Sequence, residues 1–592
     1  MRSKFLSVVS VSVALCAPYS AAAQPVPLRQ PVGVYARPDI DGCVAHPNQG
    51  SNTSTDECLS NQITALLSDP AISGVSAFVN WNDISLTIPT NSLVGTNDWS
   101  ILDDIFGAVA QWNADNPTNI PKTIQLGLQP GFHTPQWVFN NLSSCDAMFL
   151  TNSQGTIVNS QGTLVGVDPS KVTNTCGCAS FLEAEDKANP TVLPLPLPWN
   201  SFYTNAWATF IRAVAGKYGT NSLLVSMAVA GPTASSCEMI LPNENDDPTN
   251  YLKWNPLFAL EFPSDPSLAN SDTLFIQEWE DAIDVYGEAF SNLTLVVTTG
   301  TGLPNFLDTN GVPYPTYTVP PGFAPDCADT NLARIMDCAA ETTILAYFAD
   351  PRHGGKNAKA TQESGLGAVA LHIHPLGGGD LDAHGIKWLA QSTPSGSAPL
   401  PGTSNVVSRV LGGLQFDYSF SMSPQTEGCP QLGGCPTNDP ISPEQAFYNV
   451  LRAFFDGTQV GGSYGVTTSN LPLNYVQIYA ADVLYAETNS EGSLVVDGSG
   501  LTNNITAQDE FNNLSLQILE IAQVPLNVQA VGDNLQLSWP LSAAPLQLQV
   551  NSDLSKPGLW MQVPESPALI GASYEVLITP SNSAAFYRLA PP

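Results

Sequence analysis

The chain has 592 residues, a formal net charge of −33 at pH 7, and only 12% charged residues, against about 25% in an ordinary globular domain. A charge of that size and sign disfavours nucleic acids and anionic membrane surfaces as partners, because both would repel it. No segment after residue 23 is long and apolar enough to predict a membrane span.

The first residues have the pattern of a secretory signal peptide. Arg2 and Lys4 precede an apolar run over residues 5–16, and Ala21-Ala22-Ala23 offers the small residues that a signal peptidase needs. A transmembrane anchor is the alternative, but the run is too short for one. We therefore expect residues 1–23 to be removed and the mature protein to be secreted, to the extracellular space or the periplasm.

The cysteines predict disulfide bonds. Of 11 cysteines, Cys16 leaves with the signal peptide, and the ten that remain are an even number in a secreted chain. A zinc site is the alternative, but we predict no metal and no cofactor. Spacing favours the local bonds Cys43–Cys58, Cys327–Cys338 and Cys429–Cys435, which leaves Cys145, Cys176, Cys178 and Cys237 for two more.

Short β-branched runs alternate with longer amphipathic ones after residue 33, which indicates α/β architecture with parallel strands. Eight strands with intervening helices predict a (β/α)8 TIM barrel over residues 24–523, longer than the usual ~250 residues and so carrying long, disulfide-stapled loops. The strands are expected within residues 33–36, 74–81, 123–128, 223–230, 293–298, 367–373, 412–418 and 474–479.

Residues 524–592 lack a helical pattern and consist of short strand-like runs separated by Pro and Gly. This predicts a small C-terminal all-β sandwich of the immunoglobulin or fibronectin type. Its ending, Phe586-Tyr587-Arg588-Leu589, resembles the C-terminal β modules of secreted bacterial proteins. Such a module could bind carbohydrate, act as a spacer or serve in export, and we favour a structural role.

Several short motifs follow one another along the chain, and their order is more informative than any one of them. The second expected strand ends at Trp81, Leu102-Asp103 opens a helix, and the third strand leads to Pro135-Gln136-Trp137. A helix then ends at Gly216-Lys217-Tyr218-Gly219, and Gln277-Glu278-Trp279 opens another. In this order, residues 75–300 resemble the β-galactosidase-like and cellulase-like retaining glycosidases of the large (β/α)8 clan.

That resemblance implies a glycoside hydrolase with two carboxylates. The acid/base follows the fourth strand, where Glu238 is the candidate, although Cys237 stands where the family has Asn. The second carboxylate belongs at the end of the seventh strand, where Gln415 and Asp417 lie. If Gln415 holds the nucleophile position, the chain is a non-catalytic carbohydrate-binding relative; otherwise Asp417 is the first candidate, ahead of Glu427 and Glu487.

Other residues near the strand ends would bind a carbohydrate substrate. Trp81 and Trp137 would offer rings for sugar stacking, unless they cap the barrel core instead. A surface or adhesion protein, whose C-terminal module matters most, is a further alternative. The remaining substrate-binding candidates are His133, His374, Gln415, Gln477 and Tyr479.

Overall fold

The computed structural model describes residues 29–302 with gaps at 46–54, 88–95, 150–167, 169–170, 172–175, 184–190, 243–249, 262–270 and 292. Beyond them it describes 344, 347–348, 369–373, 410–415, 421, 441–448, 473–496 and 502–590, the last with short gaps. The expected signal peptide, the Cys327–Cys338 and Cys429–Cys435 bonds, Glu427 and the greater part of the later loops lie outside these residues.

Eight parallel strands close into a ring, as the sequence predicts. Each strand pairs in parallel with the next, and β10 pairs with β11 to complete the barrel. In order around the ring the strands are β1 (Gly33–Arg37), β2 (Ile72–Asn80), β5 (Thr123–Gln129), β8 (Leu224–Ala228), β10 (Thr294–Gly302), β11 (Val369–Ile373), β12 (Val410–Gln415) and β13 (Leu473–Tyr479).

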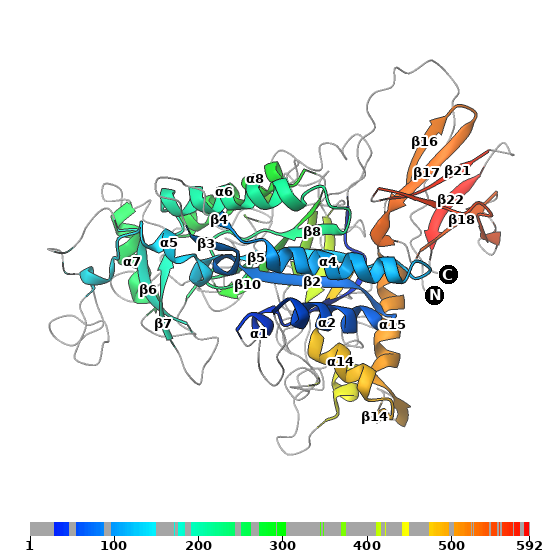
Figure 1. The fold of residues 1–592 in the computed structure, drawn as a ribbon, viewed down its shortest axis with the longest axis horizontal. Helices are drawn as coiled ribbons and strands as arrows, with labels where there is room; N and C mark the ends of the chain where they lie inside the picture. The colour runs from blue at the N-terminus through cyan, green and yellow to red at the C-terminus, as the bar shows by residue number, and fades with distance from the viewer. Residues whose placement is uncertain are drawn as a thin grey trace.

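Amphipathic helices cover the outside of the ring (Figure 1). Their apolar faces pack on the strands, and α4 alone buries Ile101, Leu102, Ile105, Phe106, Ala108, Val109 and Trp112. The helices of the described residues, including α3, α5 and α7 in the connections that follow strand ends, are α1 (Ile40–Ala45), α2 (Thr55–Ser68), α3 (Trp81–Ile84), α4 (Ser100–Asp115), α5 (Gln136–Phe139), α6 (Ser201–Tyr218), α7 (Asn250–Glu261), α8 (Ser271–Ala289), α14 (Ala480–Thr488) and α15 (Ala507–Ile521).

Side chains fill the barrel interior in layers. One such layer joins Tyr35, Val225, Val296 and Tyr475, all buried. The Tyr35 hydroxyl lies 2.7 Å from Thr123 Oγ1, so this layer is also tied by a hydrogen bond. The interior is therefore a packed core, and a ligand can bind only beyond this core, at the C-terminal ends of the strands.

Short additions leave the ring at its C-terminal end. Two hairpins, β3 (Ser85–Thr87) with β4 (Thr96–Asn97) and β6 (Cys178–Glu183) with β7 (Thr191–Pro196), lie in the βα connections. Strand β9 (Glu238–Ile240) joins the outer part of β10. A third hairpin, β14 (Ser493–Val496) with β15 (Thr502–Ile505), lies toward the opposite end of the ring, where Gln508, just after β15, donates to Asp69 Oδ1 at 3.0 Å.

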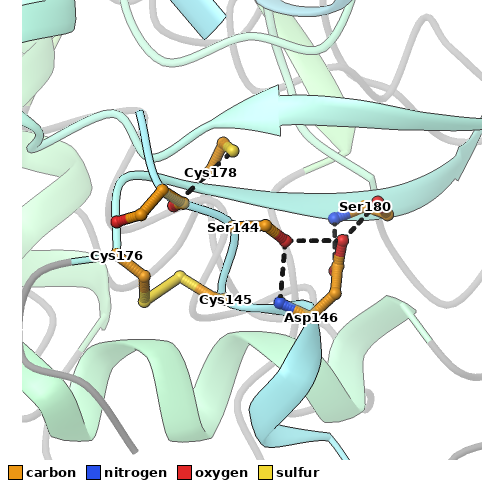
Figure 2. Close-up of a disulfide and its surroundings, with 7 residues drawn as sticks. Ser144, Cys145, Asp146, Cys176, Cys178 and Ser180 are labelled. Carbon is orange, nitrogen blue, oxygen red and sulfur yellow. Dashed lines mark hydrogen bonds between the residues drawn. A yellow bond between two sulfur atoms is a disulfide. The ribbon is translucent and has the colours of Figure 1, made fainter. Parts of the chain in front are cut away.

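The disulfides confirm one predicted pair and correct another prediction. Cys43 and Cys58 are bonded, and so are Cys145 and Cys176. Cys178 and Cys237 are both buried free thiols, so the last four cysteines supply one bond and not two. Figure 2 shows Cys178 beside the Cys145–Cys176 bond, and burial raises the pKa of its thiol to about 11, which disfavours the reactive thiolate.

Two antiparallel sheets form the C-terminal module. One holds β16 (Asn527–Val531), β17 (Asn534–Pro540), β21 (Ser573–Ile578) and β20 (Ala568–Ile570). The other holds β19 (Met561–Gln562), β18 (Gln547–Asn551) and β22 (Phe586–Ala590). They share one core and stand together at one end of the molecule (Figure 1), which agrees with the predicted all-β sandwich.

Candidate functional site

The C-terminal ends of the strands form the rim where a TIM barrel carries its site. The described side chains there come from the ends of β1, β2 and β13 and from the segments that follow β2, β5 and β8. We call this set the barrel mouth: Arg37, Phe78, Asn80, Asp83, His133, Glu238 and Tyr479.

Glu238 stands in line with the fourth barrel strand, although nine residues separate it from the end of β8. Along β10, Val296 pairs with Ala228 of β8, and Thr298, two residues further, pairs with Glu238 of β9. Residues on one strand that are two apart share a face, and Val296 belongs to the interior cluster. The register therefore aims Glu238 at the barrel axis.

The segment between β8 and β9 is anchored from two sides. The Phe132 amide donates to the Ala234 carbonyl at 2.6 Å, and the Ala234 amide donates to the Ile240 carbonyl at 2.7 Å. The Cys237 thiol donates to the carbonyl of Leu128 at 3.3 Å. These contacts hold the segment that carries Glu238 against the end of β5, and the Glu238 side chain itself is half-buried.

A second carboxylate, Asp83, lies in the mouth between the ends of β2 and β5. Burial is the main cause that raises its pKa, and the negative Asp41 raises it further. A hydrogen bond from Asn80 and the charge of His133 act in the opposite direction. Asn80 also donates to Asp41 Oδ1 at 2.9 Å, so the end of β2 links both carboxylates.

Arg37, the last residue of β1, lies between two aromatic rings of the neighbouring strands β2 and β13. Its guanidinium carbon lies 4.5 Å from the centroid of Phe78 and 5.6 Å from that of Tyr479. Both distances are within the range of a cation–π contact. Burial is the main cause that raises the pKa of the Cys237 thiol. The negative charge of Glu238 raises this pKa further, and the positive charge of Arg37 lowers it.

Trp81 and Trp137 correct the prediction that they stack on sugars. Trp81 is fully buried, and its ring contacts Trp137, Tyr203, Trp207 and Phe210. Trp137 is 7% exposed, and its indole nitrogen donates to Ser85 Oγ at 3.2 Å. Both rings belong to the core between the barrel and α6, which was the alternative interpretation of the sequence.

The other substrate-binding candidates lie at different depths. His133 and Tyr479 are half-buried in the mouth. Gln477 lies one layer lower, because its register partner on β1 is Tyr35 while that of Tyr479 is Arg37. It is 3% exposed and donates to Gln125 Oε1 at 2.9 Å, so it is an interior residue.

The structure describes only part of the seventh strand and its surroundings. Gln415 ends β12 opposite Gln477, but its side chain lies outside the described residues. Asp417 and His374 lie outside them altogether. Glu487 belongs to α14, where burial and the negative Asp69 raise its pKa. Since Asp69 precedes β2, Glu487 lies toward the opposite end of the barrel from the mouth.

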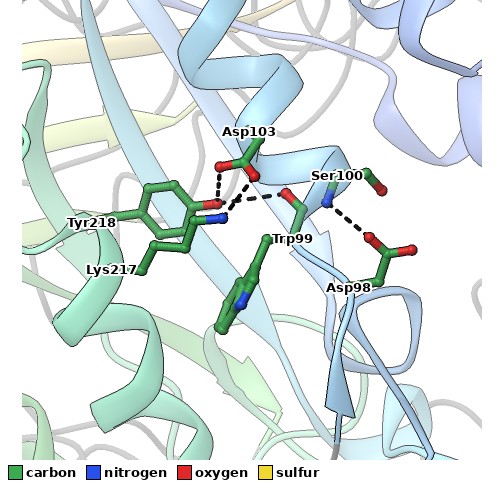
Figure 3. A network of polar contacts seen from close by, with 6 residues as sticks. All are labelled: Asp98, Trp99, Ser100, Asp103, Lys217 and Tyr218. Carbon is green, nitrogen blue, oxygen red and sulfur yellow. Dashed lines mark hydrogen bonds and ion pairs between the residues drawn. The ribbon is translucent and has the colours of Figure 1, made fainter.

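Two of the motifs behind the family resemblance contact each other on the outer surface (Figure 3). Lys217 Nζ lies 2.6 Å from Asp103 Oδ2, and the Tyr218 hydroxyl donates to Asp103 Oδ1 at 2.8 Å. The Tyr218 ring also stacks on Phe106. These residues join α6 to the first turn of α4, so they hold the scaffold together and take no part in the mouth.

Sequence reasoning missed Arg37, Asp41 and Asp83. The rule that strand ends carry the site would have found Arg37, had it been applied to the first strand. Asp83 lies in the stretch that follows the second strand, but nothing in its neighbours signals burial. Within the described part of the chain, no three His, Cys, Asp or Glu side chains are grouped to hold a metal, and no helix is long and apolar enough to cross a membrane.

Comparisons with known proteins give only remote likenesses. No family model and no curated protein matches the chain. The solved structures found include glycoside hydrolases. Endo-glycoceramidase II from Rhodococcus sp. is 12% identical, with 96% of this chain and 99% of that chain covered and a TM-score of 0.29. The catalytic domain of a family 30 xylanase from Talaromyces cellulolyticus is 11% identical over 96% and 99%, with a TM-score of 0.30. A family 30 subfamily 8 xylanase from Clostridium acetobutylicum is 8% identical over 96% and 98%, with a TM-score of 0.28. The function is therefore argued from the barrel mouth itself.

Proposed function

We propose that the chain is a secreted glycoside hydrolase that acts on an extracellular glycan, with Glu238 as its acid/base. The observation that supports this most is the register of β9, which brings Glu238 into the line of the fourth strand and toward the barrel axis. Glycoside hydrolysis needs a carboxylic acid that protonates the leaving oxygen, and a strand-end carboxyl in a TIM barrel meets that need.

The reaction needs a second carboxylate on the other side of the sugar. Asp417, after the seventh strand, remains the proposed partner. A separation of about 5 Å between the two carboxyl groups would give a retaining enzyme with a covalent intermediate, and a wider one would leave room for water and give inversion. Asp83 is another carboxylate of the mouth, but burial favours its protonated form, which suits a general acid and not the nucleophile or base that Asp417 would supply.

The test is the hydrolysis of a panel of aryl glycosides by the full chain and by Glu238→Gln. Loss of the acid should lower kcat by about 10²- to 10⁴-fold and remove its limb from the pH–rate profile. The control is Glu288→Gln, which changes an exposed carboxylate on α8 and should leave the rate unchanged. Turnover by E238Q equal to that of the wild type would contradict the assignment.

A non-catalytic carbohydrate-binding barrel is the second candidate, because Gln415 ends the seventh strand where a nucleophile would stand. This candidate predicts glycan binding with no release of reducing sugar from any substrate. Replacing Gln415 with Glu would then place a carboxylate at that position, and hydrolysis gained by Q415E but absent from the wild type would favour it over an active enzyme.

A further inference from the structure

Arg37 is the only permanent cation at a described strand end. The other described ends of barrel strands are Asn80, Gln129, Ala228, Gly302, Ile373, Gln415 and Tyr479. Around it the mouth holds carboxylates, and the whole chain carries a net charge of −33. An anionic ligand would be repelled by such a protein, unless a cation at the site itself offset the repulsion.

The N–H groups of Arg37 donate to no described residue, and it forms no ion pair with one. Arg37 is half-buried, and the two fully buried cations of the described barrel behave differently. Arg29 donates to the carbonyls of Gly219 and Asn221, and Lys122 donates to those of Asp69 and Ile72. These two cations lie at the N-terminal end of the strands and serve the fold. Arg37 instead brings five donors to the mouth without a hydrogen-bond partner among the residues that the structure describes.

The two rings explain how Arg37 is held. Phe78 and Tyr479 contact the guanidinium from the neighbouring strands β2 and β13. Aromatic contacts restrain a guanidinium while leaving its N–H edge free, and the fork of that edge matches a carboxylate with two parallel hydrogen bonds. A restrained fork loses less conformational entropy when it binds its ligand than a mobile lysine would.

We propose that Arg37 recognises a carboxylate on the substrate, so that the barrel mouth selects acidic glycans, such as those that contain uronic acids. This rests on the proposed function in one respect only, which is that a glycan binds at the mouth. Hydrolysis is not required, because Arg37 would bind the sugar carboxylate whether or not Glu238 acts on the glycosidic bond.

The experiment measures binding to the full chain by isothermal titration calorimetry. The carboxylated probes are tetragalacturonate and a hyaluronan tetrasaccharide, and the neutral probes are cellotetraose and chitotetraose. A carrageenan tetrasaccharide, which carries sulfate and no carboxylate, separates the two anionic chemistries. The proteins are the wild type, Arg37→Gln, Glu238→Gln and Arg212→Gln, of which the last removes the same charge from an exposed position on α6.

A charge-assisted hydrogen-bonded pair should make at least one carboxylated probe bind about tenfold or more tightly than either neutral probe. R37Q should lose that preference and keep any binding of the neutral probes, while E238Q and R212Q should retain it. No preference for a carboxylated probe, or an equal loss for charged and neutral probes in R37Q, would overturn the proposal. Tight binding of the sulfated probe alone would also overturn it.

The two proposals fail separately. Carboxylate-selective binding that depends on Arg37, without hydrolysis of any glycan, would leave this inference standing and remove the hydrolase. Hydrolysis that depends on Glu238, with equal rates on neutral and acidic substrates in the wild type and in R37Q, would do the reverse.

Discussion

At the scale of single residues, the mouth depends on one position without a side chain. Gly127, in β5, faces the ring of Phe78 and the sulfur of Cys237. A Cβ there would lie 2.4 Å from Phe78 Cδ1 and 3.2 Å from Cys237 Sγ. Phe78 in turn holds the guanidinium of Arg37, and Cys237 precedes Glu238. Gly127 thus allows the two halves of the mouth to approach each other.

Gly127→Ala should therefore destabilise the protein. The new methyl group forces Phe78 to move in a packed interior, which costs about 1–3 kcal/mol. The same shift should weaken binding at the mouth, since Arg37 loses one of its two rings. Thermal unfolding followed by circular dichroism, together with the calorimetric binding assay, measures both effects.

Gly107→Ala provides the matched control. Gly107 is exposed within α4, and a Cβ there would meet nothing within 4 Å. Alanine is the better helix former, so this variant should be about 0.5–1 kcal/mol more stable than the wild type. A G127A protein as stable as G107A would show that Phe78 does not fill the space opposite Gly127.

The residue scale is also where prediction from sequence reached its limit. Glu238 could be proposed because a family pattern pointed to it, but Arg37 and Asp83 matter only once the ring is closed and their neighbours are known. Trp81 shows the opposite error. A tryptophan at a strand end is compatible with stacking on a sugar and with packing in a core, and four aromatic neighbours from distant parts of the chain decide for the core.

At the scale of elements, α2 and α4 meet through like charges as well as through apolar faces. Asp104 of α4 faces Asp56 of α2, and its pKa is raised to about 6. Burial is the larger cause, and the interaction with Asp56 adds to it. Such a pair holds a proton more easily in the folded protein than in the unfolded chain, where an aspartic acid titrates near its usual value of about 3.9.

This pair predicts a pH dependence of stability. Between about pH 4 and pH 6 the folded state binds more protons than the unfolded state, so the free energy of unfolding should fall as the pH rises through that window. Asp104→Asn removes the titration. It should equal the wild type below about pH 4 and exceed it by about 1 kcal/mol at neutral pH, after allowance for solvent screening.

Urea unfolding at a series of pH values measures the effect. Asp533→Asn, in the exposed turn between β16 and β17, removes the same charge and should leave the slope as in the wild type. Equal slopes for D104N and the wild type between pH 4 and 6 would show that the two helices are not coupled through a shared proton.

The elements themselves were largely readable from the sequence. All eight barrel strands appear where β-branched apolar runs predicted them, because strands buried on both faces leave a continuous apolar signal. The short strand β9 was not predicted. Its three residues, Glu238-Met239-Ile240, carry too little pattern, and it forms only because β10 extends beyond β8 and offers an unpaired edge.

At the scale of the whole molecule, the C-terminal sheets close the end of the barrel that is opposite the mouth. Val32, just before β1, and Leu519 of α15 belong to the same apolar cluster as Leu537 and Trp539 of β17. The Ser542 hydroxyl donates to the carbonyl of Gln30. The module therefore shares its core with the barrel, which favours the structural role over the adhesion alternative.

A shared core predicts that the two parts unfold together. Val32→Ala removes a fully buried side chain from the shared cluster and should cost about 2 kcal/mol. Differential scanning calorimetry of the full chain should show one transition, which moves as a whole to lower temperature in V32A.

Val531→Ala makes the same change at a side chain of β16 that is 41% exposed, and it should alter stability by less than about 0.5 kcal/mol. Two separate transitions in the wild type, with only one of them displaced in V32A, would mean that the module folds on its own and that its contacts with Val32 do not support the barrel.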